Sequence, residues 1–425
     1  MVKSIDALSY YQATANTSIA CESLKGEVNA DVCIIGAGYT GLSAALELTT
    51  SGYKVVVLEA ETIGYGASGR NGGQVCTGFS SGQQKIENQL GKADALKCFA
   101  LAEESKALLQ QRLHQYDISC DLTWGYLHCI PKAHQFDELK AWRDEFEDLG
   151  VSGVSLLSKG ELELKLGTKI YHGALRESEA GHLHPLNYCL GLARAAIAKG
   201  AVIYEKSRVT GVSTGNAPFA RTNDGIVRAK FMIIAGNAYL GRTVKDLYGR
   251  IMPVASYIIA TEPLGETRAK SLIRDNEAVA NTKFIVDYYR RSPDHRMLFG
   301  GRASYSGIEP PNLADYMRPR MTSVFPQLQD VKIDYAWGGY IAITSNRIPD
   351  CGRLSPTVYY AHGYSGQGLA LSGLYGKLMA ETIRGVAERF DLLARVKHLP
   401  FPGGALRTPL LVAAMMYYRI RDVLS

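Results

Sequence analysis

Asp31-Val-Cys-Ile-Ile-Gly-Ala-Gly-Tyr-Thr-Gly-Leu-Ser-Ala-Ala-Leu-Glu-Leu48 is the stretch of this chain that decides its fold. Its β-branched start predicts a strand, its glycine-rich centre predicts a tight turn, and the apolar periodicity that follows predicts a helix. In such a unit Gly36 permits the turn, Gly38 lets the backbone approach a pyrophosphate, and Gly41 lets the helix pack closely on the strand. The helix N-terminus then faces the phosphate charge. The stretch therefore predicts a β-turn-helix unit that opens a dinucleotide-binding domain.

A carboxylate in the expected place supports this interpretation. A second predicted strand, residues 53–58, ends at Glu59, which lies 23 positions after Gly36 and can accept hydrogen bonds from the adenosine ribose hydroxyls. The glycine pattern alone is a weak signal, because an ordinary glycine turn before a helix has the same sequence, but the strands, the helix and Glu59 together favour a dinucleotide. The loop 60–74 carries five glycines where a nicotinamide dehydrogenase usually has a helix, which favours FAD.

Motifs over almost the whole chain resemble the family of FAD-dependent amine and amino-acid oxidases that includes D-amino-acid oxidase, sarcosine oxidase and glycine oxidase. The resembling segments are GAGYTGLSAALEL, VVVLEA, IGYGASGRNGGQ, GHLHPLNYCLGLARAA, MIIAGNAYL, RMLFGG, WGGYIAIT, GYSGQGLALSGLYGKLMAE and FPGG…RTPLL…MYYRIRD. The GASGRNGGQ loop and the tail are most similar to the branch of the family that oxidises γ-glutamylputrescine in polyamine catabolism.

This resemblance implies an α/β fold with two interleaved domains. One is a Rossmann-like FAD-binding domain of the glutathione-reductase type, and the other is an α+β substrate domain that contains an antiparallel sheet. The order of the predicted elements assigns residues 1–84, 183–251 and 336–390 to the FAD-binding domain, residues 85–182 and 252–335 to the substrate domain, and residues 391–425 to a C-terminal helical tail. Helices are predicted over residues 93–115, 138–149 and 186–199 and from about Leu369, and strands over 124–130, around 203 and over 231–235.

The motifs and the resemblance together imply the residues that bind FAD. They are Gly36, Ala37, Gly38, Tyr39, Thr40, Gly41, Glu59, Ala60, Ala67, Ser68, Gly69, Arg70, Asn71, Gly72, Gly73, Gln74, Val209, Ala235, Gly236, Gly363, Gly366, Gln367, Gly368 and Leu369. The backbone of Val209 would meet the adenine, and the turn 235–239 would lie beside the pyrophosphate. At the last motif, backbone N–H groups and a helix N-terminus would stabilise the negative charge that appears at the flavin N1–C2=O edge on reduction.

The resemblance also implies the reaction. Hydride leaves the carbon attached to the amine for flavin N5, the resulting imine hydrolyses, and oxygen reoxidises the flavin to give hydrogen peroxide. The flavin carries the difficult step, so no general base is required of the protein. No second strand–GxGxxG–helix unit follows the first, because GYGASG at residues 64–69 lies within the glycine-rich loop, and the substrate itself is therefore the expected reductant. Two alternatives stay open: oxidation of another amine, of an imino acid such as pipecolate or of a D-amino acid, and transfer of electrons to a membrane quinone.

Departures from the sarcosine-oxidase pattern concern the substrate. An arginine and a lysine bind the substrate carboxylate in those enzymes, whereas this chain has Gly73 and Ala370 at the matching positions. A small α-amino acid is therefore disfavoured, and a plain amine or a long substrate with a distant carboxylate is favoured. The candidate pocket residues are Trp337, Tyr364, Tyr288, Arg290 and Tyr305, and Arg70, Arg291 and Arg302 are further cations that could hold a distal glutamyl group. Each could equally be an ordinary core aromatic residue or a structural arginine.

The remaining sequence features mostly argue against other kinds of binding site and other locations. Ile341 stands where sarcosine oxidases have the cysteine that links to the flavin, so we expect noncovalent FAD. A net charge of +6 with dispersed Lys and Arg gives no indication of nucleic-acid binding, and nine scattered histidines predict no metal site. Eight cysteines without CxxC spacing read as reduced thiols, and we expect a cytoplasmic protein without a signal peptide or a membrane span. The segment 405–425 is expected to dock on the protein's own core or, less simply, to contact a membrane surface.

Overall fold

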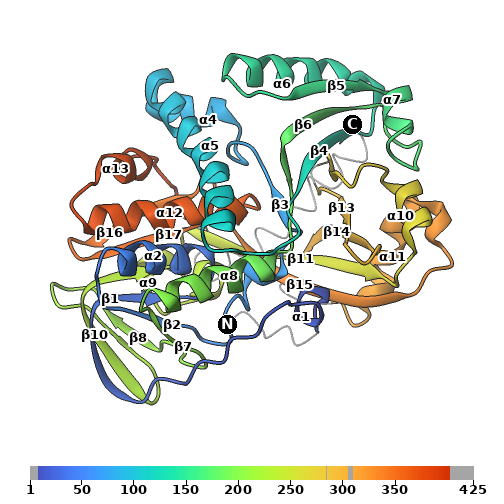
Figure 1. Ribbon diagram of the computed structural model, residues 1–425. Coiled ribbons are helices and arrows are strands. Elements are labelled where there is room, and N and C mark those ends of the chain that lie inside the picture. Colours follow the sequence, from blue (N-terminus) through green and yellow to red (C-terminus); the bar gives the residue numbers. More distant parts are fainter. Residues whose placement is uncertain (1–7, 284, 305–309, 403–425) are drawn as a thin grey trace.

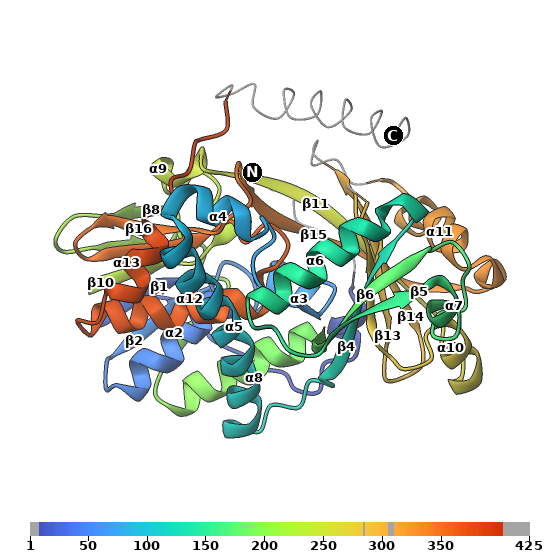
Figure 2. The same ribbon diagram turned by 90° about the horizontal axis from the view of Figure 1, so that it is seen from above.

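Two sheets form the framework of the molecule, and both views place them at opposite ends (Figure 1, Figure 2). The computed structural model describes residues 8–283, 285–304 and 310–402. The helices are α1 (Tyr10–Ala13), α2 (Tyr39–Thr50), α3 (Ala67–Arg70), α4 (Gln83–Leu90), α5 (Lys92–Gln115), α6 (Phe136–Asp148), α7 (Lys159–Glu163), α8 (Pro185–Ala198), α9 (Lys245–Tyr248), α10 (Glu266–Leu272), α11 (Leu313–Val324), α12 (Gly368–Ile383) and α13 (Glu388–Ala394).

The first sheet has the order β16-β17-β10-β1-β2-β7, and β9 and β8 extend it from β10. Its strands are β1 (Gly26–Ile35), β2 (Val55–Leu58), β7 (Val202–Tyr204), β8 (Gly211–Ser213), β9 (Phe219–Arg221), β10 (Gly225–Ile234), β16 (Asp350–Ser355) and β17 (Val358–His362). Strand β1 pairs in parallel with β10 and β2, so that Val32 lies opposite both Phe231 and Val55. One face packs on α2, α8 and α12 and the other on the β8–β9 hairpin and α9. Burial on both faces explains why the central strands are continuous apolar runs.

The second sheet is mostly antiparallel and has the order β15-β11-β14-β13-β12-β4-β6-β3, with β5 paired to β6. Its strands are β3 (Gln74–Val75), β4 (Thr123–Ile130), β5 (Val154–Ser158), β6 (Gly173–His182), β11 (Ile251–Thr261), β12 (Ala278–Asn281), β13 (Tyr288–Arg291), β14 (Met297–Ser304) and β15 (Ile333–Thr344). Helices α10 and α11 cover one part of it, and α6 covers β5 and β6. A first sheet with parallel central strands and a mostly antiparallel second sheet confirm the predicted fold class.

The predicted domain boundaries need one correction. The boundary at residue 336 divides β15, a single strand that belongs entirely to the second sheet. The chain returns to the first sheet only after Thr344, because β15 stays hydrogen-bonded to β11 up to that residue. The remaining boundaries stay predictions, and residues 403–425 of the predicted tail lie outside the described residues. In the described ranges, no helix combines the length and the apolar character that crossing a membrane requires.

Candidate functional site

A cleft begins at the carboxyl ends of β1, β2 and β10 and continues towards the second sheet. Three adjoining hollows make it up, because the first two share Gly38 and Ser68 and the last two share Gln74 and Gly366. We call the hollow around Glu59 the Glu59 end, the hollow lined by Thr40 and Ser372 the middle, and the hollow lined by Tyr288 and Glu177 the cavity. The crevice outside the carboxyl ends of parallel strands is the usual ligand site of such sheets.

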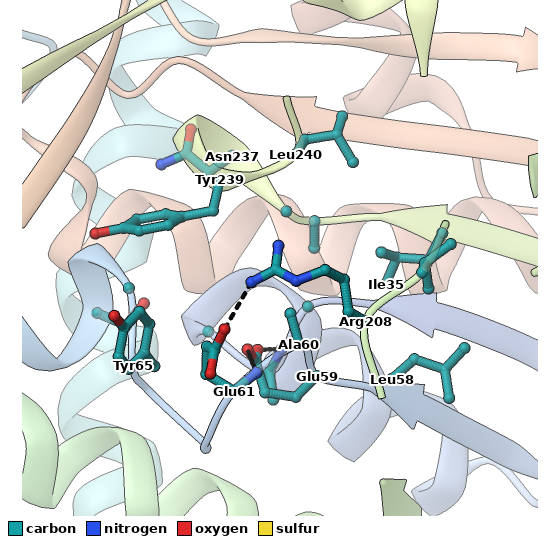
Figure 3. A pocket seen from close by; sticks show the side chains of 18 of the residues that line it. Ile35, Leu58, Glu59, Ala60, Glu61, Tyr65, Arg208, Asn237, Tyr239 and Leu240 are labelled. Atoms are coloured by element: carbon teal, nitrogen blue, oxygen red, sulfur yellow. Dashed lines mark hydrogen bonds and ion pairs between the residues drawn. The ribbon is translucent and has the colours of Figure 1, made fainter. Parts of the chain in front are cut away.

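At the Glu59 end, the carboxylate oxygens of Glu59 accept hydrogen bonds from the backbone N–H groups of Ala37 and Glu61, each with an N···O distance of 2.9 Å. Burial raises the pKa of the Glu59 carboxyl, and these two hydrogen bonds act against that shift. Figure 3 shows Arg208 paired with Glu61, at 2.6 Å, with Tyr65 and Tyr239 at one side of the pocket. The Glu59 end therefore offers a carboxylate and apolar walls to an adenosine.

In the middle, the backbone turn comes close to its neighbours. Gly36 has φ +107°, and a Cβ there would lie 2.8 Å from the carbonyl oxygen of Ala235. A Cβ on Gly38 would lie 2.8 Å from Ser68 Oγ, which accepts the N–H of Tyr39 at the start of α2. Glycines are thus needed to keep the space in front of a helix N-terminus open, as an anion site requires.

Unpaired polar atoms line the inner part of the cleft beside α12. Tyr364 and Thr40 share a hydrogen bond between their hydroxyls at 2.8 Å. By contrast, Gln74 Nε2, Gln367 Oε1 and Ser372 Oγ are buried and find no partner within the described part of the chain. Buried polar groups are normally satisfied, so these three fit a polar ligand that occupies the cleft.

The cavity has a volume of about 410 Å³ and lies between the cleft and the second sheet. Tyr288 lines it, with its hydroxyl 3.3 Å from Ser256 Oγ, and burial raises the pKa of Tyr288 to about 12. Arg70 and Arg347 also line it, as does Ile341. Ile341, which stands where sarcosine oxidases have their flavin-linked cysteine, lies within β15.

Two predicted pocket residues, Trp337 and Arg290, line no part of the cleft or the cavity. Trp337 is fully buried, with its Nε1 donating to the carbonyl of Arg70 at 3.1 Å and its ring edge-on to Tyr11. Trp337 does not line the cavity, whereas Arg70, whose carbonyl accepts the indole N–H and whose side chain lies against Gly339 on the same strand, does.

Arg290 is the second correction. Its guanidinium donates to the carbonyls of Gly72 and Leu183 and to the hydroxyl of Tyr11, at 2.9 to 3.2 Å, so it joins three buried segments instead of facing a substrate. Arg291 likewise donates to the carbonyl of Arg274. Tyr364 lines the middle and Tyr288 the cavity, while Tyr305 and the side chain of Arg302 lie outside the described residues.

Most of the predicted FAD residues line the cleft or the cavity, but four glycines do not. The lining residues are Gly36, Ala37, Gly38, Tyr39, Thr40, Glu59, Ala60, Ala67, Ser68, Arg70, Asn71, Gly72, Gln74, Val209, Ala235, Gly236, Gly366, Gln367, Gly368 and Leu369. A Cβ on Gly41, Gly69, Gly73 or Gly363 would overlap a neighbouring carbonyl or methyl group. These four glycines shape the walls of the cleft, and their role in FAD binding stays a prediction.

Comparison with known proteins gives the family. The family model described as DAO, FAD dependent oxidoreductase, matches residues 31–382. The chain belongs to this family. Over 419 residues, this chain is 40% identical to gamma-glutamylputrescine oxidoreductase of Escherichia coli (strain K12), and the match covers 98% of both chains. It is also 40% identical over 421 residues to the probable oxidoreductase OrdL of Haemophilus influenzae, covering 97% of both.

Solved structures agree on the fold of the DAO-family chain. Glycine oxidase from Geobacillus kaustophilus superposes with a TM-score of 0.69 at 20% identity, over 84% of this chain and 95% of that one. L-Proline dehydrogenase from P. horikoshii gives 0.70 at 21% identity, over 85% and 94%. The predicted family, fold and FAD dependence are thereby confirmed, and the protein is an oxidoreductase that acts on C–N groups.

The far end of the cavity could not be predicted from the sequence. His128 on β4 and Glu177 on β6 line it with Nε2 and Oε1 2.6 Å apart, and Tyr126 and Trp142 lie beside them. Nothing in the sequence signals this pair, because antiparallel pairing of β4 with β6 creates it. Nowhere in the described ranges do three His, Cys, Asp or Glu side chains group as they would around a metal ion.

Proposed function

We propose that this chain binds FAD noncovalently along the cleft and oxidises the primary amine of γ-glutamylputrescine. The products would be γ-glutamyl-aminobutyraldehyde, ammonia and hydrogen peroxide, with oxygen and water consumed. The observation that carries the substrate is the 40% identity to the Escherichia coli gamma-glutamylputrescine oxidoreductase over 98% of both chains. Since all eight cysteines are free, we also propose that the enzyme acts in a reducing compartment, the cytoplasm.

Residues of the cleft divide the work of holding the cofactor. Glu59 accepts hydrogen bonds from the ribose hydroxyls. The N-terminus of α2 and the backbone around Gly38 stabilise the pyrophosphate. Gln74 Nε2 and Gln367 Oε1 supply the unpaired donor and acceptor that a polar ring edge needs. When bound, FAD supplies the acceptor for the hydride that leaves the carbon bearing the amine.

The cavity supports a long amine as substrate. Neither Gly73 nor Ala370 brings a cation to the cleft, so an α-carboxylate next to the reacting carbon would be unpaired at these positions. Tyr288 and Ile341 give the cavity apolar walls, and desolvation against them lowers the pKa of a substrate amine, which favours the neutral form that hydride loss requires. Arg70 and Arg347 are the cations that line the same cavity and can attract a distal carboxylate.

Anaerobic reduction of the bound flavin tests this function. Purified holoenzyme is mixed with γ-glutamylputrescine, putrescine, spermidine, sarcosine, pipecolate or a D-amino acid, and the visible flavin absorbance is followed before and after air is admitted. We expect γ-glutamylputrescine to bleach the flavin fastest, and air to restore the colour with formation of peroxide. Fast bleaching by pipecolate or a D-amino acid contradicts the substrate. Bleaching that a quinone but not air reverses contradicts oxygen as the acceptor.

A further inference from the structure

The far end of the cavity holds a buried carboxylate that the proposed reaction does not use. The side chain of Glu177 is 3% exposed and lines the cavity. Its Oε1 lies 2.6 Å from Nε2 of His128, whereas its Oε2 is buried and has no hydrogen-bond partner among the residues that the structure describes. A buried carboxylate oxygen without a donor is costly unless a ligand supplies one.

The carboxyl group of Glu177 is also charged. The nearby cation Lys106 is paired with Glu103 at 2.7 Å and donates to Thr77 at 2.8 Å, so its charge already has a partner. Burial raises the pKa of Glu177, but the hydrogen bond and charge of His128, together with the Thr77 hydroxyl and the charge of Lys106, outweigh burial and hold that pKa below its ordinary value. Glu177 is therefore ionised at neutral pH and presents a negative charge to the cavity.

Aromatic rings make this end suitable for an ammonium group in particular. Tyr126 stacks on the His128 ring at 4.4 Å, and Trp142 lies 4.6 Å from the same ring. Both Tyr126 and Trp142 line the cavity next to Glu177. The faces of such rings attract cations, and an ammonium donates the hydrogen bond that Oε2 lacks.

The separation of Glu177 from the cleft indicates the length of the ligand. Gln74 lines both the cleft and the cavity, and Thr77 lines the cavity at the end that also holds Glu177. Gln74 pairs with His182 on β6, and Glu177 lies five residues away along that strand, so on the order of 15 Å of strand separates the two backbones. A ligand that reaches from the Gln74 side to Glu177 is therefore a long amine and not a small amino acid.

We infer that Glu177 is a specificity-determining residue that binds a second, unreacted ammonium group of a long amine substrate, and that His128 positions its carboxylate. The inference rests on the proposed function in one respect, namely that the reacting amine lies at the Gln74 side. In γ-glutamylputrescine the second ammonium is the α-amino group of the glutamyl moiety.

Matched ligands that differ only in the second ammonium test the inference. γ-Glutamylbutylamine and N-glutarylbutylamine lack the oxidisable amine, so their dissociation constants can be measured with the holoenzyme by calorimetry and by perturbation of the flavin spectrum. We expect the unmodified enzyme to bind the glutamyl compound roughly 10- to 100-fold more tightly, and Glu177→Gln to remove this preference while binding of the glutaryl compound stays within about twofold. Glu179→Gln, on the exposed side of the same strand, is the control and keeps the preference. FAD content and thermal midpoint of each variant report on folding.

A second pair separates this inference from the proposed function. Octamethylenediamine and octylamine share a carbon chain and differ in the second amine, and both are offered as substrates to the unmodified enzyme and to Glu177→Gln. If Glu177→Gln removes a preference for the diamine, the inference stands even when γ-glutamylputrescine is not oxidised. If neither pair shows a preference that depends on Glu177, or if both members of each pair weaken equally, the inference is overturned, whatever the substrate of the enzyme.

Discussion

The imidazole of His184 caps a helix and must be neutral to do so. Its Nδ1 accepts the N–H of Asn187 at the start of α8, at 3.1 Å, and its Nε2 lies 3.1 Å from Thr14 Oγ1. Burial and the charge of Arg290 lower the pKa of His184 to about 3, and they do the same to His182. Because an unfolded histidine has a pKa near 6.5, the unfolded chain binds more protons than the folded one between pH 3 and 6.5.

This difference predicts how stability depends on pH. The contribution of His184 is fully present above pH 6.5 and falls by about 1.4 kcal/mol per pH unit as the pH drops towards 3. Asn is also a good N-cap, so His184→Asn keeps a cap and removes the titration. From pH 6.5 to 4.5 we expect the unmodified protein to lose about 2 kcal/mol more than this variant in urea unfolding. The exposed His134→Asn serves as control, and parallel pH curves for His184→Asn and the unmodified protein would contradict the assignment.

At the residue scale, the sequence predicts what the local backbone requires. Gly36, Gly38 and Glu59 could be found because one turn and one strand end determine their positions. The orientation of Arg290 could not be predicted, since its hydrogen-bond partners come from three segments far away in the sequence. The pairing of Glu177 with His128 of another strand could not be predicted for the same reason.

At the scale of elements, the contact of α12 with α2 joins the two helices that begin at the cleft. Gly376 lies in this contact: a Cβ there would overlap the carbonyl oxygen of Thr40 and lie 2.8 Å from Cβ of Ser43. Gly373, one turn earlier, would meet only the end of the Arg112 side chain, at 3.2 Å. The two glycines therefore form a matched pair on one helix.

We expect Gly376→Ala to lower the free energy of unfolding by about 1–3 kcal/mol or more, because the backbone of α2 cannot move aside freely. It should also weaken FAD binding, since it separates the starts of α2 and α12. Gly373→Ala should be close to neutral or stabilise by up to about 1 kcal/mol, from the better helix propensity of alanine. Urea unfolding and titration of each apoprotein with FAD measure both effects. Equal losses of unfolding free energy and of FAD affinity in the two variants would show that the contact between α12 and α2 at Gly376 does not determine either quantity.

Long elements were predictable and short ones were not. Helices α5, α6 and α8 begin and end within two residues of their predicted bounds, because apolar periodicity over several turns determines them. In the glycine-rich loop, by contrast, α3 and β3 have four and two residues and depend on tertiary contacts. The unpredicted α1 is similar, since its start depends on a capping box of Ser9 with Gln12 and its Tyr11 packs on Trp337.

At the scale of the whole molecule, two sheets enclose one cleft, and the cofactor that fills it should contribute to the stability of the entire fold. A ligand that binds only the folded state stabilises by about 2.7 kcal/mol at 100 times its dissociation constant. This gain is reversible only if no covalent bond holds the flavin. Ile341 supplies no thiol, Cys351 is buried in the core, and burial raises the pKa of the cavity residue Cys76 to about 12, which leaves it a poor nucleophile.

We therefore expect acid precipitation to leave a colourless pellet and to release all the FAD into the supernatant. The apoprotein, prepared under milder conditions, should regain its thermal midpoint as FAD is added back, with a midpoint that rises with the FAD concentration. A yellow pellet would contradict noncovalent binding, and repeating the precipitation with Cys76→Ser would then show whether the cavity thiol forms the bond. A colourless pellet with a midpoint that does not respond to FAD would instead mean that the apoprotein does not bind FAD. The unpaired Gln74, Gln367 and Ser372 argue against that result, because their buried polar atoms gain partners only when the cleft is filled.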